Sequence, residues 1–423
     1  MMTFETFASA QLALLMAGFA IAFIMGAAAQ KTHFCTMGAV SDWVNMSHTG
    51  RLRAWGLAIA VATLGVVVLE LIGWVKADAS FPPYRGGSLA WIENLLGGLL
   101  FGVGMTLAGG CGNKCLVRIG GGNLKSIFVL LMVGVIAYFM VTPFPGTDKT
   151  LYSLLFYPWT NHLAVNVGAA QDLGTLLAGA EKAAWVRFAL GGIFSLWLIW
   201  LAFKSSDFRS NIDFALGGII VGLCVLAAWY VTSNIAVNVD GESYPLSQYY
   251  GEWDMLAESE DGKPAQGATL SPQSFTFVNP MGQAVGYASS GFSSTVLTFG
   301  IMAVFGIIAG SFVWALLSRA FRIEWFASVS DFVNHVIGAT LMGFGGILAM
   351  GCTIGQGITG VSTLALGSFI ALGGIILGSA LTMKVQLYKM IYEDEASFGS
   401  ALVTGLVDLK LLPESLRKLE RVD

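Results

Sequence analysis

The stretch that decides the fold is GATLMGFGGILAMGCTIGQGITGVST, residues 338–363, which has a near-copy at residues 97–122. Each copy is an apolar, glycine-rich helix that runs into a Gly-Cys pair and then into a polar break. The copies match at one constant separation, at Gly97/Gly338, Leu100/Leu341, Gly102/Gly343, Gly104/Gly345, Leu107/Leu348, Ala108/Ala349, Gly110/Gly351 and Cys111/Cys352. Such self-similarity indicates duplication, so the two Gly-Cys breaks are candidate centres of function.

The composition around these copies is that of a membrane protein. Hydrophobic residues make up 55% of the chain and charged residues only 11%, with a mean hydropathy of +0.71, whereas a soluble domain carries roughly 25% charged residues. Several nearly uncharged windows of about 18 or more residues are long enough to cross a bilayer as helices. We therefore predict an all-α polytopic membrane protein.

Nine spans are predicted, together with short re-entrant half-helices at the breaks. An amphipathic segment at 39–50 is expected to form one half-inserted helix, and the segment from Asn279 to Gly291 is expected to dip back into the membrane. The long loops 142–183 and 233–290 are expected to hold some local helix, because long structureless loops are uncommon. The predicted spans are 8–29, 53–75, 91–110, 124–141, 184–203, 213–232, 293–317, 332–351 and 364–383.

The placement of lysine and arginine sets the expected orientation, because these residues gather on the cytoplasmic side of membrane proteins. With the tail left out, ten of them fall on one side, in the turn at 204–209, near residues 31 and 51–53, and in the stretches 114–125 and 319–322, against five on the other, at residues 76, 85, 149, 182 and 263. We therefore expect a periplasmic N-terminus and a cytoplasmic C-terminus. The loop 233–290, acidic in its middle, then faces the periplasm.

This orientation makes the duplicated units inverted. Residues 1–141 form the predicted first repeat, 142–212 an outer loop and a connecting span, 213–383 the second repeat, and 384–423 a cytoplasmic tail. Such a 4+1+4 inverted-topology repeat around broken helices is typical of transporters, whose substrate site lies near the midplane. Broken backbone at that depth must be buried or line a polar cavity.

The candidate chemistry at the midplane is that of thiols. Cys111 and Cys352 follow the two duplicated helices, and Cys35 lies in a third break. Short helices after the breaks would aim free N–H groups and positive dipole ends at the centre, which suits a small anion. Lys31, Lys114 and Arg118 would add attraction on the cytoplasmic side. The five cysteines are odd in number and scattered, so no disulfide framework is predicted.

Three motifs make the chain resemble a known family. They are QKTHFCTMGAVSDW (30–43), LAGGCG (107–112) and LAMGCTIGQG (348–357), and they are similar to motifs of the YeeE/YedE family of bacterial inner-membrane proteins. The resemblance implies uptake of thiosulfate, passed along the path by S–H···S and S–H···O contacts from Cys35, Cys111 and Cys352. It also implies a separate TusA-like sulfur-carrier protein at the cytoplasmic face. The fourth inverted station, near Asn279, carries no cysteine.

The supporting residues of this predicted path are Lys31, Gly110, Lys114, Gly351 and Gln356. No enzyme activity, cofactor, metal site or nucleic-acid partner is predicted. Two alternatives stay open: a transporter of a selenium compound, and a thiol-disulfide oxidoreductase using Cys35, Cys111 or Cys115. The second is disfavoured because Cys111 and Cys352 enter from opposite faces and no Cys-x-x-Cys occurs. Cys224, inside the sixth span, is interpreted as packing.

Overall fold

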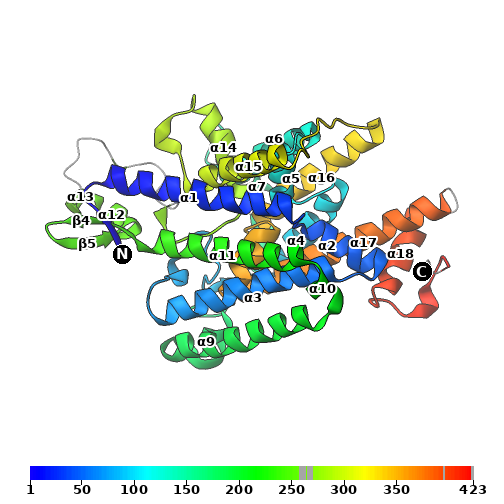
Figure 1. The fold of residues 1–423 in the computed structure, drawn as a ribbon, viewed down its shortest axis with the longest axis horizontal. Coiled ribbons are helices and arrows are strands. Elements are labelled where there is room, and N and C mark those ends of the chain that lie inside the picture. The colour runs from blue at the N-terminus through cyan, green and yellow to red at the C-terminus, as the bar shows by residue number, and fades with distance from the viewer. Residues whose placement is uncertain (257–262, 264–269, 394–395, 421–423) are drawn as a thin grey trace.

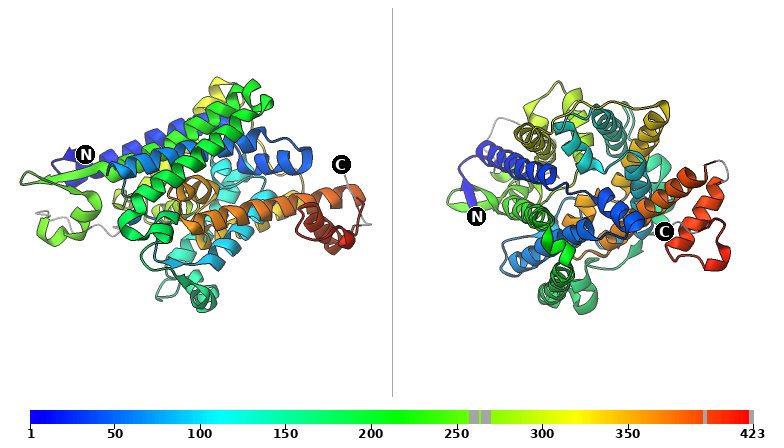
Figure 2. Two further views of the ribbon diagram at one scale, coloured as in Figure 1. Left: turned by 90° about the horizontal axis from the view of Figure 1, so that it is seen from below. Right: turned by 45° about the vertical axis from the view of Figure 1, so that its right-hand side comes forward.

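A computed structural model describes residues 1–256, 263, 270–393 and 396–420. Within these residues, nine helices are long and apolar enough to cross a membrane, which confirms the prediction of an all-α polytopic membrane protein. They lie side by side along the long axis of the molecule (Figures 1 and 2). The nine are α1 (Phe7–Lys31), α3 (Gly50–Leu71), α4 (Trp91–Leu107), α6 (Leu124–Val141), α9 (Leu173–Lys204), α11 (Ile212–Asn234), α15 (Phe299–Leu317), α16 (Val329–Leu348) and α17 (Leu366–Tyr392).

Four shorter helical segments complete the centre: α2 (Thr36–Met46), α5 (Gly112–Gly120), α14 (Val278–Ser289) and the π-helical turn η5 (Gly355–Gly360). The loops hold η1 (Ala77–Ala79), α7 (Leu151–Leu155), α8 (Tyr157–Thr160), η2 (Asn161–Leu163), α10 (Ser206–Ser210), α12 (Leu246–Gly251), α13 (Trp253–Leu256) and η4 (Ser294–Val296). The predicted local helix in both long loops is therefore confirmed. The C-terminal part holds α18 (Phe398–Asp408) and η6 (Glu414–Leu416).

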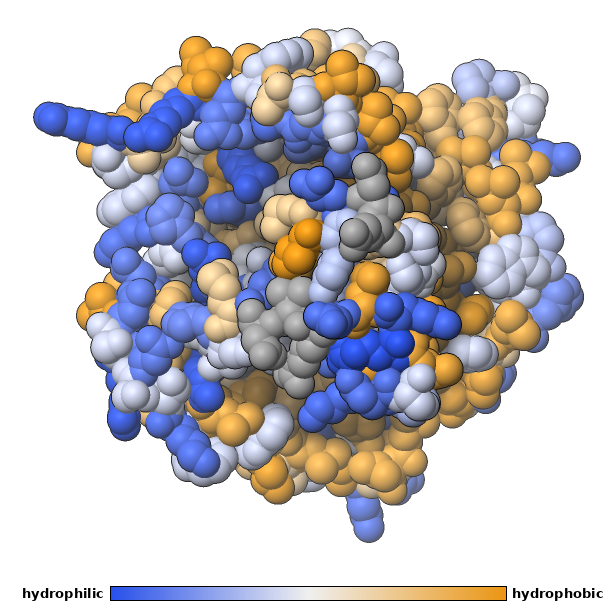
Figure 3. Space-filling view, turned by 90° about the vertical axis from the view of Figure 1, so that its right-hand side faces the viewer, coloured by the Kyte–Doolittle hydropathy of each residue, from blue (hydrophilic) through white to orange (hydrophobic). Residues whose placement is uncertain are grey.

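The little sheet present ties the N-terminus to the second long loop. Strand β1 (Met2–Phe4) pairs in parallel with β4 (Ile235–Val239), which pairs antiparallel with β5 (Glu242–Pro245). A second pair joins β2 (Ser88–Leu89) to β3 (Val165–Asn166). We call the end with β1 the N-side and the opposite end, with α18, the C-side (Figure 1). The C-side surface is largely hydrophilic, with hydrophobic residues toward its edges (Figure 3).

The duplicated helices α4 and α16 cross each other through their glycines. A Cβ added at Gly345 would lie 2.6 Å from the Gly97 oxygen, and one added at Gly338 would lie 2.6 Å from the Gly104 oxygen. Residues near the start of one helix contact residues near the end of the other, so the two helices run antiparallel. The backbones approach this closely because glycine has no side chain, and the two copies form each other's contact surface.

Helix pairing throughout the bundle is reciprocal. Helix α1 packs along α15 as α11 packs along α3, α4 packs on α17 as α16 packs on α6, and α14 packs on α6 as α2 packs on α17. When α1, α2, α3, α4, α5 and α6 are exchanged, in that order, for α11, α14, α15, α16, η5 and α17, each pair becomes the other. From this exchange we propose that residues 1–141 and 213–383 are two inverted repeats. Residues 142–212 then form a connector, and 384–423 a tail.

Several predicted boundaries were wrong. The fifth span begins at Leu173, well before the predicted start, and turns sharply at Gly179, whose φ of 74° is in the left-handed region that glycine adopts freely. The seventh begins at Phe299, after an irregular segment predicted as helix. The ninth continues to Tyr392, because its charged end packs against α18. The acidic Glu258, Glu260 and Asp261 lie outside the described residues.

A buried ion network braces the N-side. Arg187 of α9 bonds Asp172 (Nε to Oδ1, 2.7 Å) and Glu70 of α3 (NH1 to Oε1, 2.6 Å). Arg85, in the loop before α4, pairs with the same Glu70, and its Nε donates to the Thr363 carbonyl at 2.9 Å. The loops are thereby joined to the end of the break that follows Cys352.

Asp172 makes this network sensitive to acid. Burial alone raises the pKa of the Asp172 carboxyl, but hydrogen bonds from Arg187 and Thr175 outweigh it and lower the pKa to about 2. Because the folded pKa lies below the unfolded value, this carboxylate stabilises the fold fully above about pH 4 and loses its contribution as the pH falls toward 2. The contribution is on the order of 2 kcal/mol.

We therefore expect Asp172→Asn to lower the melting temperature of the purified protein at pH 7. The same substitution should flatten the loss of melting temperature between pH 4 and 2. The matched control is Asp148→Asn, which changes an exposed carboxyl. Equal acid profiles for the wild-type and Asp172→Asn proteins would show that this carboxylate does not brace the fold.

Candidate functional site

Each of the three predicted cysteines stands at the start of a short helix. Cys35 and Cys111 have extended backbones and are the N-cap residues of α2 and α5. Cys352 directly precedes the helical turn that contains η5. Their carbonyls accept the first helical hydrogen bonds: Cys35 from Ala39 (3.0 Å), Cys111 from Cys115 (2.9 Å) and Cys352 from Gln356 (2.8 Å). The three breaks thus share one local geometry.

The sulfur atoms lie against free N–H groups of these helix starts. The Cys35 sulfur accepts from the Gly38 amide at 3.4 Å. The backbone amides of Ile354, Gly355 and Phe277 lie near the Cys352 sulfur and favour negative charge on it. A helix N-terminus carries a partial positive charge, so these thiols sit where an anion is electrostatically favoured.

The fourth helix start lies opposite and has no thiol. Phe277 is the N-cap residue of α14, and its carbonyl accepts from the Met281 amide at 3.1 Å. The buried, extended segment before it, 273–277, was predicted to be part of the outer loop, and the re-entrant helix begins at Val278. Sequence reasoning missed this segment because polar residues alternate with its two phenylalanines.

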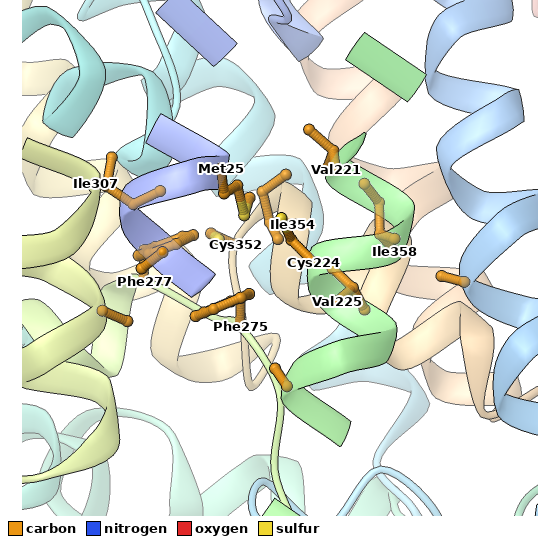
Figure 4. Close-up of a cluster of buried hydrophobic side chains, with 14 of the residues drawn as sticks. Met25, Val221, Cys224, Val225, Phe275, Phe277, Ile307, Cys352, Ile354 and Ile358 are labelled. Carbon is orange, nitrogen blue, oxygen red and sulfur yellow. The ribbon is translucent and has the colours of Figure 1, made fainter. Parts of the chain in front are cut away.

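The three predicted cysteines come together in the fold. Cys111 lies within electrostatic range of both Cys35 and Cys352, and the Thr353 hydroxyl lies beside its thiol. Figure 4 shows Cys352 beside Phe277, with Met25 and Ile354 nearby. All three thiols are buried and free. The segments that meet here are distant in sequence, as expected for a site formed by two units.

The helices of the four breaks point in two directions from this centre. Helices α2 and α5 run toward the C-side, where Asn123, between α5 and α6, bridges to Glu324. Helix α14 and the turn with η5 run toward the N-side, where Leu364 accepts a backbone bond from Leu173 at 3.1 Å. All four N-termini therefore face the centre, and all four C-termini face away from it.

The predicted supporting residues fall into different places. The Lys31 ammonium lies 5.7 Å from the Trp314 ring centroid and is exposed, so the structure does not bring it to the thiols. Gly110 leaves room for the Lys114 side chain, whose Cγ would be 3.1 Å from an added Cβ. Gly351 is tight against Gln356, whose amide donates to the Ala349 carbonyl and so caps α16.

The Lys114 side chain places a positive charge on the C-side of the thiols. Its ammonium lies within electrostatic range of the thiols of Cys35 and Cys111 and of the guanidinium groups of Arg118 and Arg51. It makes no ion pair within the described part of the chain. An unpaired, mostly buried ammonium is costly unless an anion comes close to it.

Sequence reasoning missed Arg51 as a site residue. A Cβ added at Gly38 would lie 2.6 Å from the Arg51 NH1 and 3.6 Å from the Cys35 Cβ, so the guanidinium lies beside this thiol. Its Nε also pairs with Asp42 at 3.4 Å. Arg51 stands just before a span, where it was counted only for orientation, and no motif marks it.

The other two cysteines lie around this centre, and Cys115 is close enough to Cys35 and Lys114 to interact with them electrostatically. Cys115 lies on α5, and its thiol donates to the Gly110 carbonyl at 3.7 Å. Cys224, on α11, points toward Ile354 in the hydrophobic cluster of Figure 4. Among the described residues, no three His, Cys, Asp or Glu side chains are arranged to hold a metal ion.

Comparisons with known proteins show which proteins this chain is similar to. A family model described as sulphur transport matches residues 31–381, a range that includes all three thiols. The thiosulfate transporter TsuA of Escherichia coli is 24% identical over 383 residues, covering 86% of this chain and 92% of that protein. The thiosulfate transporter TsuA of Spirochaeta thermophila is 24% identical over 370 residues, covering 86% and 96%.

Proposed function

The chain belongs to the sulphur transport (YeeE/YedE) family, and from this premise we propose that it carries thiosulfate, or a closely related small sulfur anion, through the centre where Cys35, Cys111 and Cys352 meet. It is a multi-pass membrane transport protein and not an enzyme. The relatives named as thiosulfate transporters support thiosulfate as the first substrate to test.

The observation that carries the proposal is the meeting of three thiols, each at a helix start. The helix N-termini supply a positive potential for an anion. The thiols are weak hydrogen-bond donors that match a soft terminal sulfur. Conduction requires binding that is weak and spread over several sites, and three neighbouring thiols provide such sites in sequence.

We further propose that the N-side faces the periplasm and the C-side the cytoplasm of a bacterial inner membrane. Arg51, Lys114 and Arg118, which face the C-side of the thiols, would then draw the anion inward. This assignment follows the bias of basic residues toward the cytoplasm. A TusA-like carrier protein is the proposed acceptor of the sulfur on that side, for cytoplasmic assimilation.

The redox alternative has no disulfide to support it, and the one observation in its favour is that Cys115 lies within electrostatic range of Cys35. Cys115 bonds a backbone carbonyl rather than another thiol, and all five cysteines are free. A resolving partner would have to lie within disulfide distance of the attacking thiol. The selenium alternative would use the same centre, so only an uptake experiment distinguishes it from thiosulfate transport.

The test is uptake of ³⁵S-thiosulfate into proteoliposomes that hold the purified full chain. We expect uptake above that of protein-free liposomes, inhibited by unlabelled thiosulfate. Sulfite and selenite are the competing substrates to compare. Liposomes that take up neither thiosulfate nor the competitors would contradict the proposal. Uptake of selenite alone would assign the selenium alternative.

A further inference from the structure

Three fully buried donor groups on the N-side have no hydrogen-bond acceptor within the described residues. They are the Tyr84 hydroxyl, the Trp229 Nε1 and the Thr276 hydroxyl. They come from three separate segments: the loop between α3 and α4, helix α11, and the extended segment before α14. Buried polar groups in folded proteins almost always find a partner, so each exception calls for an explanation.

Tyr84 and Thr276 both lie close to Cys352. Tyr84 is near enough for its hydroxyl and the Cys352 thiol to interact electrostatically. Its loop is tied to the segment before α14 by a bond from the Phe81 amide to the Pro272 carbonyl, 3.0 Å. The Thr276 hydroxyl lies 2.4 Å from where a Cβ on Gly355 would stand, and the Gly355 amide lies near the Cys352 sulfur.

Trp229 faces the same segment. On its helix, the Val225 carbonyl accepts from the Ser274 hydroxyl at 2.8 Å, and the Thr232 hydroxyl donates to the Gln273 carbonyl at 2.7 Å. Residues 225, 229 and 232 are spaced by four and three and so share one helix face. Trp229 therefore lies on the helix face that packs against the segment carrying Thr276.

The chemistry of the three groups favours an anion with oxygen acceptors. An indole N–H only donates, and hydroxyls donate as well as accept. Burial raises the pKa of Tyr84, so its hydroxyl keeps its proton. Because all three groups are neutral, they bind an oxyanion without the strong attraction that would trap it.

We propose that Tyr84, Trp229 and Thr276 form an oxyanion subsite on the N-side of Cys352. This inference rests on the proposed function, and it assigns an orientation to the ion. The oxygens are held by the three donors, while the terminal sulfur faces the Cys352 thiol. The subsite thereby selects ions that carry oxygens at one end and a soft atom at the other.

The test is thiosulfate binding to the purified full chain, measured by calorimetry for the wild type and for Tyr84→Phe. Loss of one hydrogen bond to a charged group is expected to weaken binding about tenfold or more. The melting temperature without thiosulfate should not fall, because the deleted hydroxyl has no protein acceptor. Trp229→Phe should weaken binding similarly, and Tyr287→Phe, at the far end of α14, should leave it unchanged.

Sulfate separates this subsite from the thiol path, because it has oxygens but no soft terminal sulfur. Its inhibition of thiosulfate binding should weaken in Tyr84→Phe and persist in Cys352→Ala. If the wild type binds thiosulfate and Tyr84→Phe binds it equally well, the subsite is refuted while the proposed function stands. A wild-type protein that neither binds nor transports thiosulfate would overturn both.

Discussion

Replacement of Cys352 by alanine is expected to lower thiosulfate uptake by proteoliposomes roughly ten- to a hundredfold, and Cys111→Ala should do the same. Each change removes a contact to a charged ion worth about 1.5–3 kcal/mol. The Cys352 sulfur lies against three backbone amides, so no neighbouring side chain can take its place. Cys35→Ala is expected to lower uptake to a similar degree, because Cys35 lies on the proposed path and also caps α2.

The controls for this result are within the chain. Cys224→Ala changes a buried thiol that has no helix break beside it, and it should leave uptake close to wild type. Cys115→Ala should do so as well. If uptake survives the loss of Cys35, Cys111 and Cys352 one by one, the relay along the thiols is wrong. Dependence on Cys115 together with sensitivity to reductants would instead support the redox alternative.

The second large effect is expected at the helix crossing. Gly345→Ala would place a Cβ 2.6 Å from both the Gly97 oxygen and the Phe101 nitrogen. These are backbone atoms of a helix and cannot move aside alone, so α4 and α16 must separate. Overpacking of this kind costs about 1–3 kcal/mol or more. We expect loss of the monodisperse peak in size-exclusion chromatography, or a clearly lower melting temperature.

Gly373→Ala is the matched control, because it lies in α17 and an added Cβ there meets nothing within 4 Å. It should leave the protein folded and raise its stability by up to about 1 kcal/mol, as glycine in a helix is unfavourable relative to alanine. Equal behaviour of the two variants would show that the glycines at the crossing are not what holds the two copies together.

The composition predicts the class, and the duplicated stretch together with the third break predicts that Cys35, Cys111 and Cys352 lie near one centre. Apolar length and composition fix which segments can span, and a fourth span predicted at 124–141 coincides with α6. The two Gly-Cys pairs lie near the same centre because the helices that precede them, α4 and α16, pack on each other. Those inferences needed only local pattern and repeat.

What could not be predicted depends on contacts between distant segments. Tyr84 lies in a loop without a motif, and long-range bonds, from Phe81 to Pro272 and from Arg85 to Thr363, bring that loop to Cys352. The N-terminal strand was not predicted, since its partner β4 is more than two hundred residues away. Lys31 seemed placed for the centre by its position next to the first break, but its side chain turns onto α15.

The outward-facing C-termini of the four short helices have a consequence for the direction of flow. An ion entering from either face first passes carbonyl ends of helices and then meets amide ends, so the dipoles form a well at the midplane rather than a slope across it. Such a minimum of electrostatic energy holds an ion at the centre but does not drive its net movement across the membrane. In the proposed uptake, the asymmetry that favours inward movement then comes from Lys114 and Arg118 on α5, with Arg51 nearby, and from whatever removes the ion once it has passed.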